Sequence, residues 1–229
     1  MPNIFHSWHD FLPIFARDIL PIYERHEQDF DFMGFHGRRH ATRSVIFAEL
    51  LGRAYTSLGV SEIDMEGLRL VVAFHDAARE ANGEDEWERQ SAEACKVYLL
   101  QQGKADTYAT AIERAMLEKH AQAGNLLTQI LHDADVLEFM RFLVNNKRGL
   151  KLFRRNELTL FSEEDLYFHR VMHMQAQRNV LIQEIWKFVF ETEWMNVQLT
   201  NEQFLPTYLS LFTQNEAKYP LMNRFFSLK

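Results

Sequence analysis

Hydrophobic side chains recur at spacings of three and four residues along the chain, and strict alternation of apolar and polar positions is scarce. The first spacing is typical of amphipathic helices and the second of strands. The sequence therefore predicts an all-α protein. We expect helices over 7–27, 40–58, 61–79, 85–102, 107–120, 126–145, 162–190 and 201–216.

Two of the predicted helices begin with residues suited to a helix N-terminus. Ser61 is followed by acidic residues in the first turn, and Asp85 is followed three residues later by Glu88. A short polar side chain accepts backbone N–H bonds at such a position, and a nearby carboxylate complements the helix dipole. We expect Ser61 to cap one helix, and Asp85 with Glu88 to form a capping box on the next.

A basic connector at 145–157 is the one shift in composition along the chain. It would separate a catalytic core at about 30–145 from a C-terminal helical cap at about 158–229. Because the connector is short, we expect one domain over 1–229. The aromatic residues of segment 186–212 have helical spacing, which suits either core packing or a homodimer face.

Composition limits the class of protein. The 229 residues are 47% hydrophobic and include 19 Phe, enough apolar surface for a substantial core. The net charge of −7 argues against a broad nucleic-acid surface. A small phosphorylated or nucleotide-like substrate remains compatible, because a bound divalent metal dominates the field in its own cleft.

Cysteine content and hydropathy indicate the compartment. Cys95 is the only cysteine, so no internal disulfide framework exists. No window approaches the roughly 18 apolar residues of a membrane span, and the first residues lack the pattern of a cleaved secretory signal. We expect a cytoplasmic protein with no membrane partner. An effector exported without a cleaved signal would have the same features.

Three segments combine imidazole with carboxylate or basic side chains, as metal-assisted hydrolysis requires. The first runs from His36 through His40 to Arg43, the second is the pair His75-Asp76, and the third begins at His132-Asp133. Adjacent residues on a helix point about 100° apart, so His75 and Asp76 cannot both enter one core seam. Both can touch one ion beside the end of the helix.

The order of these motifs resembles the HD superfamily of metal-dependent phosphohydrolases, in which a histidine precedes an HD pair and a late aspartate. His40, His75-Asp76 and Asp133 stand at the matching positions. The resemblance covers about 36–140 and implies an HD-domain helical bundle with extra C-terminal helices. It also implies that His40, His75, Asp76 and Asp133 bind a divalent metal ion, with Mn, Mg, Fe, Zn, Ni and Co all admissible.

The same resemblance suggests residues for catalysis and substrate binding. His36 and His120 match further histidines of small HD phosphohydrolases, and Arg79 matches a basic residue that contacts substrate phosphate. We also assign Arg43 and Lys119 to substrate binding. The residues alone allow a structural role for each with equal weight. His36 could be a helix cap or a surface residue, and His120 could be a cation at a helix C-terminus. Arg43 could pair with a structural carboxylate.

The HGRRH motif and the acidic segment at 80–91 are also similar to the phosphodiesterase domains of SidE-type effectors, which cleave ADP-ribosylated ubiquitin. That group uses a glutamate and histidines, which makes Glu88 a catalytic candidate.

The sequence thus predicts a metal-dependent phosphohydrolase or phosphodiesterase acting on a nucleotide-derived phosphoester, with His36, Asp76, Arg79, Glu88 and His120 as catalytic candidates. The alternatives are a SidE-like phosphodiesterase acting on an ADP-ribosylated protein, and an HD-fold nucleotide-binding module without activity.

Overall fold

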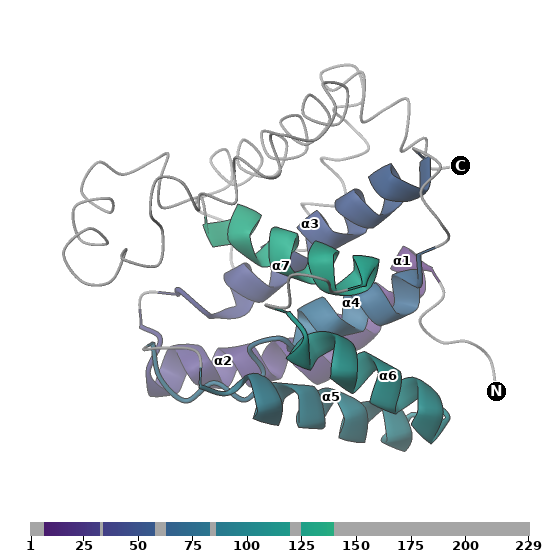
Figure 1. Ribbon diagram of the computed structural model, residues 1–229. Coiled ribbons are helices and arrows are strands. Elements are labelled where there is room, and N and C mark those ends of the chain that lie inside the picture. Colours follow the sequence, from purple (N-terminus) through teal and green to yellow (C-terminus); the bar gives the residue numbers. More distant parts are fainter. Residues whose placement is uncertain (1–6, 33, 58–62, 83–85, 120–124, 140–229) are drawn as a thin grey trace, which may run out of the picture. The chain divides into compact units, whose positions relative to one another are not determined.

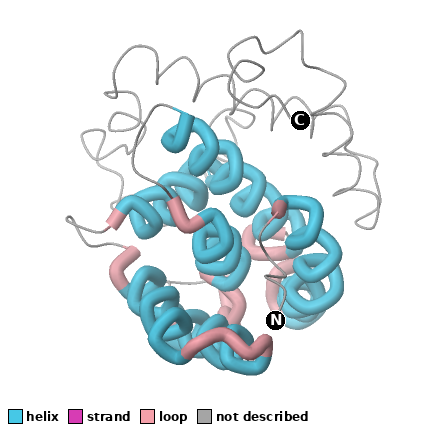
Figure 2. Tube along the Cα trace, turned by 90° about the vertical axis from the view of Figure 1, so that its right-hand side faces the viewer, coloured by secondary structure: helices cyan, strands magenta, loops and turns pink. Residues whose placement is uncertain are grey.

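The computed structural model describes residues 7–32, 34–57, 63–82, 86–119 and 125–139. All regular secondary structure in these ranges is helical, as Figure 2 shows. The all-α prediction is therefore confirmed. The connector at 145–157 and the predicted helices at 162–190 and 201–216 lie outside the described residues.

The helices follow one another along the chain as labelled in Figure 1. In order, they are α1 (Trp8–Ile14), the π-helical segment η1 (Phe15–Ile19), α2 (Leu20–Asp29), α3 (Arg38–Ser57), α4 (Met65–Phe74), α5 (Glu88–Gln101), α6 (Asp106–Leu117) and α7 (Leu126–Phe139).

The chain divides into two compact units, Met1–Ala134 and Asp135–Lys229. The first unit contains helices α1 to α6 and most of α7. The second unit begins within α7, and its described part is 135–139. The features below belong to the first unit.

The helical run at the start of the chain contains a π-helical segment. The sequence predicts one helix over 7–27, whereas the structure has α1, η1 and α2 in direct succession. Pro21 lies at the start of α2 and has no N–H to donate to the carbonyl four residues earlier, so the regular α pattern is interrupted there. The N–H of Leu20 instead bonds the carbonyl of Phe15 five residues back, which is the π-helical pattern.

Helix α4 forms the centre of the first unit. Its residues from Gly67 to Phe74 are all buried, and it contacts α3, α5, α6 and η1. Burial on all sides explains why this segment is almost continuously apolar. The one charged residue in that stretch, Arg69, pairs with the buried Glu49 of α3.

The C-terminal end of α4 leaves three successive carbonyl groups that need hydrogen-bond partners. The ring Nδ1 of His75 lies 2.7 Å from the carbonyl oxygen of Val72, and the hydroxyl of Tyr23 donates to Ala73 over 2.8 Å. The N–H of Ala77 donates to Phe74 over 2.9 Å. The end of this buried helix is therefore fixed, and with it the position of the His75-Asp76 pair.

Two predicted helix starts are wrong. Helix α4 begins at Met65 with Asp64 as its N-cap, and the side chain of Asp64 accepts the N–H of Gly67. Helix α5 begins at Glu88 with Trp87 at the N-cap, without a side-chain cap bond. Glu88 is thus the first helical residue of α5, whereas the predicted start at Asp85 lies outside the described residues.

Within the described ranges, none of the helices combines the length and the apolar character that crossing a membrane would demand.

Candidate functional site

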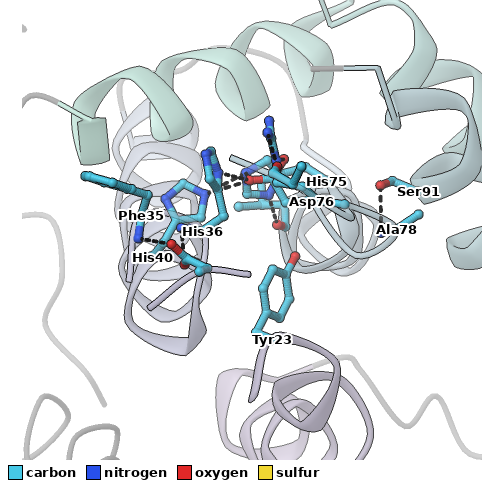
Figure 3. A network of polar contacts seen from close by, with 12 residues as sticks. Tyr23, Phe35, His36, His40, His75, Asp76, Ala78 and Ser91 are labelled. Carbon is cyan, nitrogen blue, oxygen red and sulfur yellow. Dashed lines mark hydrogen bonds and ion pairs between the residues drawn. The ribbon is translucent and has the colours of Figure 1, made fainter. Parts of the chain in front are cut away.

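Three side chains from α3 and from the turn after α4 converge on one point (Figure 3). The Nε2 atoms of His40 and His75 lie 2.9 Å apart. The Oδ2 atom of Asp76 lies 3.3 Å from Nε2 of His40 and 3.5 Å from Nε2 of His75. All three side chains are buried, with 2–3% of their surface exposed. The structure therefore brings together three of the four residues for which the sequence predicts metal binding.

The hydrogen bonds fix the protonation of His75. A carbonyl oxygen only accepts, so the Nδ1 atom of His75 carries the proton that it shares with Val72. A neutral His75 ring then carries a lone pair on Nε2, which lies 2.9 Å from Nε2 of His40. That lone pair and the Asp76 carboxylate oxygen face the same point, where a proton or a metal ion would stabilise both.

His36 lies beside this cluster, just before α3. Its Nδ1 atom is 2.8 Å from Oδ2 of Asp76, and its ring packs edge-on against that of His40 at 5.5 Å. Its side chain is 19% exposed, compared with 3% for Asp76. Since a carboxylate only accepts, Nδ1 is protonated and a neutral ring keeps its lone pair on Nε2. His36 is thus a partly exposed base that is oriented by a buried carboxylate.

The surrounding histidines keep Asp76 ionised. Complete burial on its own raises the pKa of a carboxyl group. When the His75 ring is protonated, its charge together with the hydrogen bonds from His36 and His40 outweighs that effect and holds the pKa of Asp76 well below its usual value. The cluster therefore has a fixed negative charge at its centre.

Arg79 links the cluster to the start of α5. Its Nε atom lies 3.5 Å from Oδ1 of Asp76, and its guanidinium group lies over the ring of Trp87 at 5.5 Å. Trp87 immediately precedes Glu88, a half-buried residue at the start of α5. The sequence predicts roles for both Arg79 and Glu88, and these roles stay predictions.

Two acidic residues, one in the last turn of α2 and one just after it, hold the segment that carries His36, and they were not among the residues predicted from the sequence. Asp31 accepts the backbone N–H groups of Phe35 and His36. Glu27 accepts the N–H of Arg38 over 2.8 Å and also binds its guanidinium group. A signal was available, because an aspartate followed within a few residues by glycine is typical of a side-chain-stabilised turn.

The other predicted site residues are placed as follows. Asp133 lies on α7, with its Oδ1 atom 4.0 Å from Nδ1 of its neighbour His132. Arg43 is 2% exposed and is among the largest fully buried side chains of the described residues. Lys119 is buried just after α6, and His120 lies outside the described residues. Roles in metal binding for Asp133 and in substrate binding for the other three stay predictions.

The donor set fits a divalent metal ion. Tetrahedral zinc with bonds of about 2.0–2.1 Å places its ligand atoms roughly 3.3 Å apart. The separations of 2.9, 3.3 and 3.5 Å among His40, His75 and Asp76 lie around that value. The ligand atoms of His36, His40 and Asp76 also all lie within 4.8 Å of one another. The cluster is therefore compatible with metal as well as with a shared proton.

Comparison with protein families gives a match to the SidE phosphodiesterase (PDE) domain over residues 32–204. The matched range includes His36, His40, His75 and Asp76 and extends over well more than half of the chain. Comparisons with curated proteins and with solved structures give no match. The match bears on the SidE resemblance and leaves the resemblance to the HD superfamily a prediction. The chain therefore belongs to the SidE phosphodiesterase domain family and is a phosphodiesterase.

Proposed function

We propose that the chain hydrolyses a nucleotide-derived phosphodiester at the cluster of His36, His40, His75 and Asp76. The observation that carries this proposal is the pairing of His36 with Asp76, which leaves a lone pair on a partly exposed imidazole. Positioned imidazole bases contribute about 10²- to 10⁴-fold to proton-transfer steps.

In the proposed reaction, His36 acts as the general base. Its Nε2 atom removes a proton from water as the water oxygen attacks phosphorus and the bond from phosphorus to the leaving oxygen breaks. The Asp76 carboxylate stabilises the imidazolium ion that forms, because it already accepts the Nδ1–H bond. Glu88 is the candidate acid that returns a proton to the leaving oxygen.

Fixed cationic groups would offset the charge that develops on the phosphate oxygens. Arg79 is the best placed of the predicted residues, since it already lies beside Asp76 and is supported by the ring of Trp87. Its guanidinium group provides several N–H donors in a planar arrangement that matches phosphate oxygens. Lys119 and His120 remain predicted contributors.

The proposal includes a divalent metal ion bound at the same cluster. His40, His75 and Asp76 would hold a divalent ion, and Asp133 is the predicted fourth ligand. When bound, such an ion would lower the pKa of water and polarise a phosphoryl oxygen. The ionised Asp76 and the Nε2 lone pair of His75 support this assignment, because both present electron pairs to one point.

Family membership supports an ADP-ribosylated protein as the substrate. Such a substrate contains a diphosphate linkage between an adenosine group and a protein-bound ribose, so it offers both a nucleotide and a scissile phosphorus–oxygen bond. A free nucleotide-derived phosphoester would satisfy the same cluster. Comparing the two as substrates distinguishes these possibilities.

The test uses the full chain with bis(4-nitrophenyl) phosphate and with ADP-ribosylated ubiquitin. We expect His36→Ala to lower kcat by about 10²- to 10⁴-fold. The exposed His9, outside the cluster, provides the matched control, and His9→Ala should retain the wild-type rate. Equal rates in wild type and His36→Ala, with unchanged circular dichroism, would refute the catalytic assignment.

Metal content measured on the same preparations tests whether the reaction depends on a bound metal ion. Bound metal that is lost in Asp76→Asn, together with inhibition by a chelator, supports a metal centre. Full activity in metal-free protein indicates acid–base catalysis by the histidines alone. Tight binding of an ADP-ribose probe without turnover would instead favour the non-catalytic binding module.

A further inference from the structure

The loop between α2 and α3 places His36 next to Asp76, and one residue organises it. Asp31 uses all four of its polar groups within this region. Its N–H donates to the carbonyl of His26 over 2.7 Å, and its own carbonyl accepts the N–H of Gly34 over 2.9 Å. Its two carboxylate oxygens accept the N–H groups of Phe35 and His36 at 2.8 and 2.7 Å.

The carboxylate of Asp31 is completely buried. Among the described residues, no lysine or arginine pairs with it, and its charge is balanced by the two backbone N–H groups. Burying a charge without an opposite charge is unfavourable, so the two hydrogen bonds must be well formed for the loop to hold. Gly34 supports the same turn with a φ of +69°, a conformation that other residues adopt at a cost.

The bond to the N–H of His36 has a direct consequence for its ring. Anchoring the backbone nitrogen restricts where the ring can lie, and in this position Nδ1 is 2.8 Å from Oδ2 of Asp76. The other end of that bond is also fixed, because Asp76 follows the hydrogen-bonded end of α4. Hydrogen bonds between side chains and the main chain therefore stabilise both positions, at the N–H of His36 and at the end of α4 that precedes Asp76.

We propose that Asp31 is a positioning residue that sets the ring of His36 for catalysis, an inference that rests on the function proposed above. Asp31 acts through the backbone of His36 and does not touch the substrate. Both carboxylate oxygens are needed, since one binds Phe35 and the other His36. An asparagine has only one acceptor oxygen, and its NH₂ group would face a backbone N–H.

The experiment compares Asp31→Asn with wild type in the full chain, using bis(4-nitrophenyl) phosphate as the probe. We expect kcat to fall by about 10- to 100-fold, because small displacements of a reacting group carry costs of that order. KM should stay within about twofold, since Asp31 makes no contact with the substrate. Wild-type kcat in a folded Asp31→Asn would overturn the inference.

Asp64→Asn is the matched control for loss of a capping carboxylate. The two oxygens of Asp64 also accept two hydrogen bonds, from the N–H of Gly67 and the hydroxyl of Tyr108. Asp64 caps the opposite end of α4 from the cluster. The Asp64→Asn variant should therefore have a lower free energy of unfolding and an unchanged kcat. An equal loss of kcat in both variants would mean that general destabilisation, rather than positioning, causes the effect.

Two further measurements keep the inference testable. If Asp31→Asn does not fold, Gly34→Ala strains the same turn without disturbing the buried carboxylate, and an unchanged kcat in that variant overturns the inference. NMR of the His36 Nδ1 proton gives a readout that does not depend on activity. A proton that is protected in wild type and exchanges rapidly in Asp31→Asn would show that Asp31 positions the His36 ring. This result would hold even if the protein hydrolyses neither bis(4-nitrophenyl) phosphate nor ADP-ribosylated ubiquitin and the proposed function fails.

Discussion

Replacing Glu49 by glutamine tests whether a buried ion pair holds together the two helices of the cluster. Glu49 lies on α3 after His40, and Arg69 lies on α4 before His75. The oxygens of Glu49 accept two bonds from the Arg69 guanidinium group at 2.8 and 3.0 Å, and the two side chains are only 5% and 4% exposed. Arg53 also binds Glu49 but is 30% exposed.

The magnitude follows from the burial of the pair. Glu49→Gln removes the negative charge that faces the Arg69 guanidinium group, and breaking a buried pair in this way costs about 3–5 kcal/mol. Arg53 can turn to water, so its loss contributes only about 0–1 kcal/mol. Because domains are typically stable by roughly 5–15 kcal/mol, the single variant should be severely destabilised.

The double variant Glu49→Leu with Arg69→Met distinguishes this cause from loss of packing. Replacing both partners by apolar residues of similar size is often neutral or stabilising. We expect the double variant to recover most of the stability that the single variant loses. The assay is urea unfolding followed by far-UV circular dichroism, with the midpoint compared at constant slope. A loss below about 1 kcal/mol in Glu49→Gln would refute the reasoning, since that is the range of exposed pairs.

Three further predictions each concern one buried side chain. Tyr23→Phe removes the hydroxyl that binds the carbonyl of Ala73, so urea unfolding should show a loss of about 1–3 kcal/mol, and an unchanged midpoint would contradict the role assigned to that bond. Burial lowers the pKa of His26, so the folded state takes up its proton less readily than the unfolded state, and unfolding free energy should fall as pH drops below about 6.5. The fall from pH 7 to about 5.5 should be smaller in His26→Phe, as measured by unfolding at each pH. Cys95 is fully buried and burial raises the pKa of its thiol, so native protein should react with a thiol reagent only as fast as it unfolds, whereas rapid labelling would show that the site is accessible.

Several features of the fold and site were predictable from the sequence because they depend on local pattern. The apolar run that ends at His75-Asp76 predicts a buried helix delivering two polar side chains to one end, and α4 has that form. The convergence of His40 on that pair followed from a resemblance in motif order, and the structure places the three side chains together. The all-α class follows from helical spacing, which does not depend on how the helices pack.

Other features were decided only by tertiary structure. The pairing of His36 with Asp76 joins residues 40 positions apart. The spacing of hydrophobic residues in the sequence does not specify which ring nitrogen of His36 faces the carboxylate and which keeps its lone pair. The hydrogen bond from Tyr23 to the carbonyl of Ala73 depends on how α2 and α4 pack, which the sequence of either helix alone does not encode. The start of α5 at Glu88 also differs from the capping signal at Asp85, because packing overrides a local preference worth only about 1 kcal/mol. The sequence determines which residues are chemically able to act, and the packing of the helices determines which of their atoms meet, because hydrogen bonds require contact within about 3 Å.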